Sequence, residues 1–306
     1  MQSNASSSAS TPKFLRRLTR DLFDFERPGT TGEHLHFRLL EFVLAGAAGH
    51  LCWTWGWYIQ QNVSEPLLRL GFAQYLDVSF MFDHYIAVGN ALLIIGLLAL
   101  GFFRAWRPAY LAALLLFHLQ YVSRYILGEI SHGSNLVGMG VLGLGLAHLW
   151  FSEERLRRRF TFGFLYFFIG LGYTSAGFCK LIGTGITWAN GHHLWMWIAE
   201  RKVDVMSEVG AFEPNLLQEI ILSDVTVATL VLSFGHLVEL AGVLAWWRRV
   251  RYPVMLLLVS MHIGIILSMN IVFFWTTTLL CLLALPWGTF YDRVRASGRT
   301  PAVPAK

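Results

Sequence analysis

The sequence predicts an all-α fold, a polytopic transmembrane helix bundle with interfacial helices on the external face. Of the 306 residues, 55% are hydrophobic and only 14% are charged, and the mean hydropathy is +0.50. A soluble globule of this size would need more polar surface, so the composition indicates a membrane protein. Apolar runs of about 20 residues, the length that crosses a bilayer as a helix, recur along the chain. Short basic clusters separate these runs.

The apolar runs predict about eight membrane spans. They lie near residues 38–60, 85–103, 108–129, 134–151, 160–183, 225–246, 252–270 and 272–289. So few residues separate the last two runs that a re-entrant hairpin is an alternative to two full spans. The longer connections, 61–84 and 184–224, mix apolar and charged residues, and we expect them to form interfacial helices over the external ends of the spans.

The segments outside the spans have distinct compositions. Residues 1–12 are mostly small and polar with no hydrophobic period, which predicts a disordered tail. Residues 13–29 combine apolar residues at helical spacing with arginines, which is typical of an amphipathic helix on an anionic leaflet. A membrane domain over residues 30–290 and a cytoplasmic tail over 291–306 complete the predicted organisation.

The basic residues also predict the topology. Cytoplasmic loops of membrane proteins carry an excess of lysine and arginine. With the N-terminus inside, 19 of the 24 lysines and arginines fall on the cytoplasmic side, three fall outside, and two lie within spans. We therefore expect a multi-pass integral membrane protein with both termini in the cytoplasm. Because this topology accounts for the basic clusters, nucleic acid is not expected as a partner.

Several kinds of chemistry have no motif in the chain. The three cysteines lie in apolar runs without CxxC spacing, and no HExxH or repeated HxxxH box is present, so we expect no metal cofactor. Neither a P-loop nor a GxSxG elbow occurs, which argues against nucleotide use and serine hydrolysis. What remains is chemistry with a lipid-soluble cofactor, a transport path or a purely structural bundle.

Lys180 is the main candidate for a functional residue. It lies near the external end of the fifth run, and a charge in hydrocarbon costs about 2.5–3.5 kcal/mol on insertion scales, so such a residue marks a site by default. Tyr173 and Gly177 share a helical face with Lys180, which predicts that the lysine faces the bundle. The alternative is a side chain that reaches outward to the interface.

Other polar side chains are expected at the depth of Lys180. Arg124 and Tyr121 lie in the outer half of the third run, His132 lies in the turn that follows, and Asn270 ends the seventh run. Taken alone, each of these is a turn or capping residue. Their convergence at one depth indicates a site.

A second polar group is expected deeper in the bilayer. His236 and Glu239 lie one turn apart on the sixth run, where they could share a proton, and His262 lies midway along the seventh. The alternative for the first two is a satisfied interhelical contact. Glu41 and His118 are isolated in their runs and are interpreted as structural.

Several of these motifs together resemble the vitamin K-dependent gamma-carboxylase family and its wider membrane domain, the HTTM domain. The segment AGFCKL at 176–181, followed by Trp188 and Gly191, resembles the AG-x-x-KL and W-x-x-G motifs of that family. The segment SHGSNL at 131–136 is similar to its asparagine-histidine-serine turn. Glu239 followed by Leu-Ala-Gly, and His262 in the next span, match in the same order. The resemblance covers residues from about 30 to 290.

The resemblance implies a quinol-dependent reaction at the external face. In that family the lysine at the position of Lys180 is the base that deprotonates vitamin K hydroquinone, and the histidine at His132 assists. Oxygen then yields a strong base that removes a glutamate proton so that CO2 adds. Arg124 is a candidate carboxylate binder, and the other candidate binding residues are Tyr121, Tyr173, Trp188, His236, Glu239, His262 and Asn270. Carboxylases also carry a large extramembrane portion for their substrate, whereas this chain ends soon after its last run.

The leading hypothesis is therefore a membrane enzyme that uses a lipid-soluble quinol and oxygen on a peptide or small-molecule substrate at the external face. The alternative is a non-catalytic accessory or maturation protein that binds a peptide or lipid partner, in which Lys180 only pairs with an acid. A transporter would favour inverted repeats, and the sequence has no evident internal symmetry.

Overall fold

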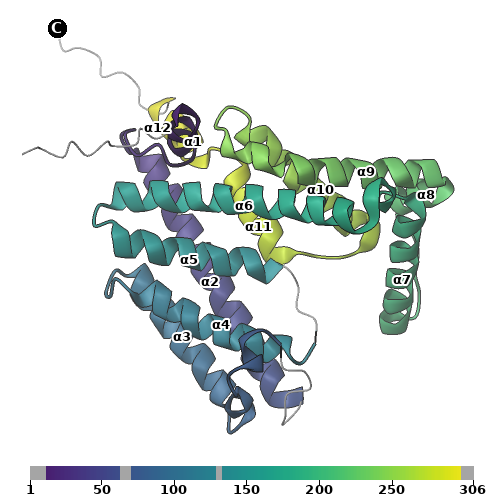
Figure 1. The fold of residues 1–306 in the computed structure, drawn as a ribbon, viewed down its shortest axis with the longest axis horizontal. Helices are drawn as coiled ribbons and strands as arrows, with labels where there is room; N and C mark the ends of the chain where they lie inside the picture. The colour runs from purple at the N-terminus through teal and green to yellow at the C-terminus, as the bar shows by residue number, and fades with distance from the viewer. Residues whose placement is uncertain (1–11, 63–69, 129–132, 298–306) are drawn as a thin grey trace, which may run out of the picture.

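A computed structural model describes residues 12–62, 70–128 and 133–297, and these residues form an all-helical fold, as predicted (Figure 1). The α-helices are α1 (Lys13–Phe23), α2 (Thr31–Asn62), α3 (Ile86–Phe102), α4 (Ala109–Tyr125), α5 (Gly133–Trp150), α6 (Glu154–Thr184), α7 (Gly191–Val209), α8 (Leu216–Ser223), α9 (Val225–Leu240), α10 (Arg251–Met269), α11 (Phe274–Ala284) and α12 (Trp287–Ser297). The 3₁₀ helices are η1 (Gly71–Gln74), η2 (Ser79–Phe82), η3 (Gly185–Trp188) and η4 (Ala241–Trp246).

Two groups of helices pack on either side of the bundle. Helix α2 contacts α3, α4 and α5, and α4 contacts both α3 and α5. Helix α6 packs against α9 and η4, and also against α5. Helix α11 contacts α10, α5 and α2, and so joins the groups. Near the start of α6 lie α1 and α12, and beyond its end lie α7 and α8, with α7 running across the direction of α6 (Figure 1). Helix α6 therefore runs from the end of the molecule that holds α1 and α12 to the end that holds α7 and α8.

Within residues 12–62, 70–128 and 133–297, three helical stretches are long and apolar enough to cross a membrane. They are Glu154–Trp188, Val225–Trp246 and Arg251–Met269, which contain the fifth, sixth and seventh predicted runs almost entire. Helices α3 and α11 are apolar but shorter. At 11 residues, α11 is about 16 Å long, roughly half the thickness of a hydrocarbon core.

The connecting segments differ in part from the prediction. Within the described residues of the 61–84 segment, α2 continues to Asn62 and is followed by η1 and η2. Left-handed backbone at Gly71, His84 and Tyr85 limits longer helices there. The 184–224 segment does form helices α7 and α8, and Asn215 closes a capping box at the start of α8.

The terminal segments pack against the bundle. Residues 1–11 of the predicted disordered tail lie outside the described residues. In α1, Leu22 is buried against α6, whereas Phe14 and Leu15 are exposed, which fits an amphipathic helix. Helix α12 makes the first part of the predicted C-terminal tail helical, and it packs on the start of α2. There, the Gly32 amide donates to Asp292 Oδ1 at 2.8 Å.

Replacing Gly288 in α12 by alanine is expected to lower the free energy of unfolding by about 1–3 kcal/mol, the usual cost of overpacking. A Cβ at 288 would lie 2.7 Å from the Glu33 nitrogen and 2.7 Å from the Gly32 carbonyl carbon, so the backbone of α2 would have to move. Thermal unfolding in detergent, followed by tryptophan fluorescence, measures the loss. The matched control is Gly46→Ala in α2, where an added Cβ meets no atom within 4 Å. Equal losses in both variants would contradict this packing.

A buried ionic cluster joins α2 to the connection between α3 and α4 and to the first turn of α4. Glu41 of α2 has no exposed surface. Its carboxylate lies 2.7 Å from Arg38 Nη1, 2.5 Å from Arg104 Nη1 and 2.9 Å from Arg104 Nη2. The Tyr110 hydroxyl donates to the same carboxylate at 2.9 Å. Glu41 is therefore structural, as interpreted from the sequence, but it is not isolated.

Candidate functional site

Lys180 of α6 forms an ion pair with Glu239 of α9. The Nζ atom lies 2.6 Å from Oε1 and 2.6 Å from Oε2 of the carboxylate. The side chains are 29% and 13% exposed, so the pair lies at the edge of the packed interior. As predicted, Lys180 faces a neighbouring helix.

Close packing of α6 on α9 and η4 brings the two charges together. A Cβ on Gly177 would lie 2.9 Å from the Leu240 side chain, and one on Gly242 would lie 2.8 Å from Tyr173 Cβ. Only glycine permits such an approach at both positions. Where α9 changes into η4, the Thr174 hydroxyl accepts from the Val243 amide at 2.7 Å and donates to the Leu240 carbonyl at 3.2 Å.

The ion pair forms part of the wall of an apolar cavity of about 480 Å³. Helices α7, α9 and α10 supply most of the lining, which includes Trp197, Val231, Met261 and Ile265. Trp188 of η3 lies beside the lysine, with Nζ 4.4 Å from its ring centroid. The volume lies within the range of about 300–1,000 Å³ that is usual for small-molecule sites.

His236 faces the same cavity with an unusual set of contacts. It is 7% exposed, and neither of its ring nitrogens has a hydrogen-bond partner among the described residues. Nδ1 lies 3.9 Å from Glu239 Oε2, and the ring centroid lies 5.2 Å from that of Trp188. A buried imidazole without hydrogen bonds is costly, because its polar atoms have lost water. A polar group in the cavity would satisfy it.

A second polar contact joins α6 to α10. The Tyr173 hydroxyl and His262 Nε2 lie 2.5 Å apart, and the His262 ring packs edge-on against Phe273 at 5.4 Å. Phe273 lines a different cavity, whereas Met261, next to His262 in sequence, lines the Lys180 cavity. The Tyr173–His262 contact therefore adjoins both cavities.

Arg124 lies in this second cavity, apart from Lys180. The cavity has a volume of about 680 Å³, and its lining includes His50, Tyr58, Ser134 and Trp275. The Arg124 guanidinium stacks on the Tyr58 ring at 3.8 Å and donates to the Gly128 carbonyl at 3.3 Å. The expected convergence of polar residues at one depth is thus divided between two cavities.

The remaining candidates occupy other places. Tyr121 stacks on Tyr125, 5.8 Å between ring centroids, and meets Trp55 edge-on at 5.9 Å. Asn270 ends α10 in the left-handed conformation, with φ of 55°. His132 lies outside the described residues, although Gly133 and Ser134, which follow it in sequence, line the Arg124 cavity.

The sequence placed Lys180 and Glu239 in the same list of candidates but did not pair them. It coupled Glu239 to His236 instead, because those two lie one turn apart. The missed signal was charge, because a lysine and a carboxylate on consecutive apolar runs neutralise each other when they meet. The lining contributed by α7, including Leu194 and Trp197, was also missed.

Among the described residues, no group of three or more histidine, cysteine, aspartate or glutamate side chains is placed to hold a metal ion. Comparison with protein families, with curated proteins and with solved structures finds no match for the chain.

Proposed function

We propose that the protein is an integral membrane enzyme that binds a lipid-soluble quinol in the Lys180 cavity and couples its oxidation by oxygen to carboxylase-like chemistry. The observation that carries this proposal is the set of proton-exchanging groups, Lys180, Glu239 and His236, on the wall of an otherwise apolar cavity. An apolar cavity suits a greasy ring, and the polar groups could orient its hydroxyls.

The residues present fit a quinol head group. Trp188 and Trp197 offer aromatic surfaces at one side of the cavity, with ring centroids 6.0 Å apart. The unpartnered nitrogens of His236 could hydrogen-bond a phenolic hydroxyl or carbonyl. When bound, a hydroquinone supplies phenolic protons and two electrons for oxygen, and in the family that the chain resembles this oxidation drives proton removal from a substrate carbon to which CO2 adds.

The ion pair gives Lys180 a route to act as a base. A proton that moves from Nζ to a carboxylate oxygen 2.6 Å away leaves a neutral amine beside a neutral acid. Lys180 then accepts a phenolic proton, and His236 holds the hydroxyl in place. Arg124 in the second cavity is the candidate binder for the carboxylate of a peptide or small-molecule substrate.

The proposal includes the membrane topology. We infer about eight spans, both termini in the cytoplasm and the Lys180 site near the external face. In support, the arginine-rich α1 and the start of α6 lie at one end of the molecule, and the crosswise α7 lies at the other (Figure 1). Helix α7 then lies at the external interface. Helix α11 is too short to cross the membrane alone and needs the segment before it to do so. If it does not cross, α10 and α11 form the re-entrant hairpin that is the alternative to two full spans.

Filling the cavity provides the test. Gly264 of α10 lines the cavity, and a Cβ there meets no atom within 4 Å, so Gly264→Phe places a ring inside it. We expect this variant to bind quinone at least about tenfold more weakly, equivalent to about 1.4 kcal/mol. Quenching of tryptophan fluorescence in nanodiscs measures binding, and oxygen uptake with reduced quinone measures turnover.

The control is Gly96→Phe in α3, where an added Cβ also meets open space. It should bind quinone like the wild type. Wild-type protein that neither binds quinone nor oxidises reduced quinone in air would refute the proposal.

A second function is favoured by one observation. Lys180 is fully paired with Glu239, as the alternative of a non-catalytic accessory protein requires. In that case the cavity holds a lipid or an apolar peptide side chain, and the ion pair only stabilises the bundle. The two functions differ in what a Lys180→Met, Glu239→Met double variant can still do.

A further inference from the structure

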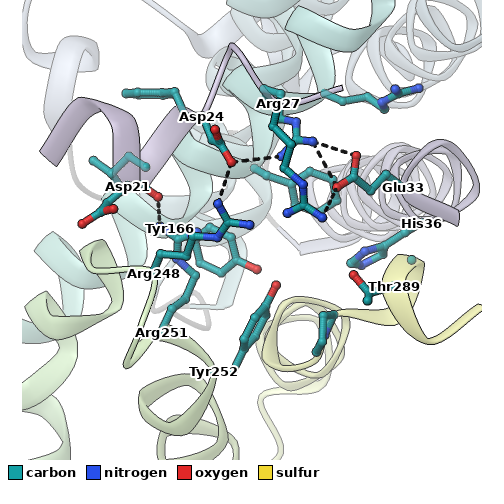
Figure 2. Close-up of a pocket in the computed structure, with 17 residues that line it drawn as sticks. Asp21, Asp24, Arg27, Glu33, His36, Tyr166, Arg248, Arg251, Tyr252 and Thr289 are labelled. Atoms are coloured by element: carbon teal, nitrogen blue, oxygen red, sulfur yellow. Dashed lines mark hydrogen bonds and ion pairs between the residues drawn. The ribbon is translucent and has the colours of Figure 1, made fainter. Parts of the chain in front are cut away.

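A second charged site lies at the other end of the molecule, where α1, α2, α6, α10 and α12 meet. It is a cavity of about 100 Å³, large enough for a small oxyanion (Figure 2). Neither the quinol proposal nor the resemblance involves it. Because it lies some distance along α6 from Lys180, its function can be tested separately.

The lining of this cavity has an excess of positive charge. Five arginines, Arg27, Arg158, Arg159, Arg248 and Arg251, face three carboxylates, those of Asp21, Asp24 and Glu33. Glu33 contacts Arg159 at 2.8 Å and Arg27 at 3.7 Å, and Asp24 contacts Arg248 at 2.7 Å. Arg158 pairs with Glu154, outside the lining. The local carboxylates therefore compensate only part of the charge.

Arg251 is the cation with the least compensation. It is 7% exposed, and its guanidinium donates to three backbone carbonyls, those of Asp21, Ala245 and Trp246, at 2.6, 2.9 and 3.3 Å. Among the described residues it forms no ion pair with a carboxylate, although it stacks on the Tyr166 ring at 4.3 Å. The Asp21 carboxylate attracts this guanidinium without touching it. A buried cation that no carboxylate contacts directly is costly, so an anion in the cavity would stabilise the fold.

The neighbouring surface indicates where such an anion could come from. Helix α1 presents Lys13, Arg16, Arg17 and Arg20 around an open hollow that shares Asp24 with the arginine cavity. Phe14 and Leu15 of the same helix are 59% and 46% exposed. Exposed apolar side chains beside basic ones are typical of a helix that lies in the headgroup region of an anionic leaflet. If α1 lies in this way on a leaflet, lipid phosphates lie next to the arginine cavity.

We infer that the arginine cavity binds a phosphate ester, supplied by the headgroup of an anionic phospholipid. Guanidinium groups match the tetrahedral oxyanion in geometry as well as charge. Basic pockets between membrane helices on the cytoplasmic side commonly hold such headgroups. The bound phosphate neutralises Arg251 and Arg248 and fastens α1 and α12 to the bundle.

The test uses delipidated full-length protein in neutral detergent. The probes are short-chain phosphatidylglycerol, short-chain phosphatidylcholine and inorganic phosphate, and the readouts are thermal unfolding and lipid adducts in native mass spectrometry. We expect phosphatidylglycerol to raise the Tm by about 5 °C when present well above its dissociation constant, with phosphatidylcholine giving little shift.

Two neighbouring arginines provide a matched pair of variants. Arg248→Gln removes a cavity residue and should raise the dissociation constant of phosphatidylglycerol about tenfold, through loss of a charge-assisted contact. Arg249→Gln removes the same charge from an exposed residue that does not line the cavity, and should bind as the wild type does. Arg251→Lys should also weaken the binding of phosphatidylglycerol. Arg251 is buried, so this variant could fail to fold; in that case the comparison of Arg248→Gln with Arg249→Gln tests the inference.

The outcomes separate the sources of the phosphate. Protection by phosphatidylglycerol that depends on Arg248, and that inorganic phosphate does not reproduce, identifies a lipid headgroup. Protection by inorganic phosphate with the same dependence on Arg248 keeps the site and assigns it to a free phosphate. Equal effects of Arg248→Gln and Arg249→Gln, or no preference for phosphatidylglycerol over phosphatidylcholine, would overturn the inference.

Discussion

Glu41→Gln is expected to lower the free energy of unfolding by about 3–5 kcal/mol, the cost of removing one partner from a buried ionic cluster. The glutamine keeps the shape of the side chain but leaves Arg38 and Arg104, which are 28% and 26% exposed, without their counter-ion. The Tyr110 hydroxyl also loses a charged acceptor. Unfolding by SDS in mixed micelles, followed by tryptophan fluorescence, gives the free energy.

The control for this prediction is Glu208→Gln, an exposed residue near the end of α7. It should change the free energy of unfolding by no more than about 0.5 kcal/mol, as is usual for surface substitutions. Replacing Glu41, Arg38 and Arg104 together by methionine should cost less than Glu41→Gln alone, since no unpaired charge then remains. A small effect of Glu41→Gln would show that water reaches the cluster.

Lys180→Ala is expected to reduce quinol turnover by about 10²–10⁴-fold, the usual contribution of a general base. Glu239→Gln should cause a similar loss, because the amide can neither take the proton from Nζ nor stabilise the ammonium. His132→Ala should lower turnover as well, if the assisting role that the resemblance implies is right. The control is Lys202→Ala on α7. It removes a positive charge from a residue that does not line the cavity, and it should keep full turnover.

The same residues discriminate between the enzyme and the accessory protein. In stability, Lys180→Met and Glu239→Met should each be costly and the double variant less costly than their sum, with a coupling of about 0.5–3 kcal/mol for groups in contact. Both functions predict that result. If the protein is a non-catalytic accessory protein, the double variant should bind its partner better than either single variant, with or without quinone. If the protein is the proposed enzyme, the double variant should remain inactive in quinol turnover even where its stability is restored.

The sequence predicted the helices well because their signal is local. The apolar runs predicted the ends of α10, and of the stretch formed by α9 and η4, to within one residue. The face of α6 that contains Gly177 correctly predicted that Lys180 points toward the bundle. The partners of buried charges could not be predicted in this way. Glu239 is 59 residues from Lys180 and Arg104 is 63 residues from Glu41, so each pairing depends on how whole helices pack.

Depth along the membrane normal was a weaker guide than packing. Arg124 and Lys180 were placed at similar depth, yet the positions of α4 and α6 within the bundle separate them into two cavities. Depth fixes one coordinate of a side chain and leaves the two in the membrane plane undetermined. The pattern of apolar runs carries no information on those two, because any face of a span can meet either lipid or another helix.

The contact between α2 and α12 has a consequence for the order of folding. The hydrogen bond from the Gly32 amide to Asp292 joins residues 260 positions apart, so it cannot form until synthesis has passed Asp292. Closing so long a loop is an entropic cost that the other helices must already have met. We therefore expect α12 to dock late, after the rate-limiting barrier. Gly288→Ala should therefore speed unfolding while leaving the folding rate nearly unchanged.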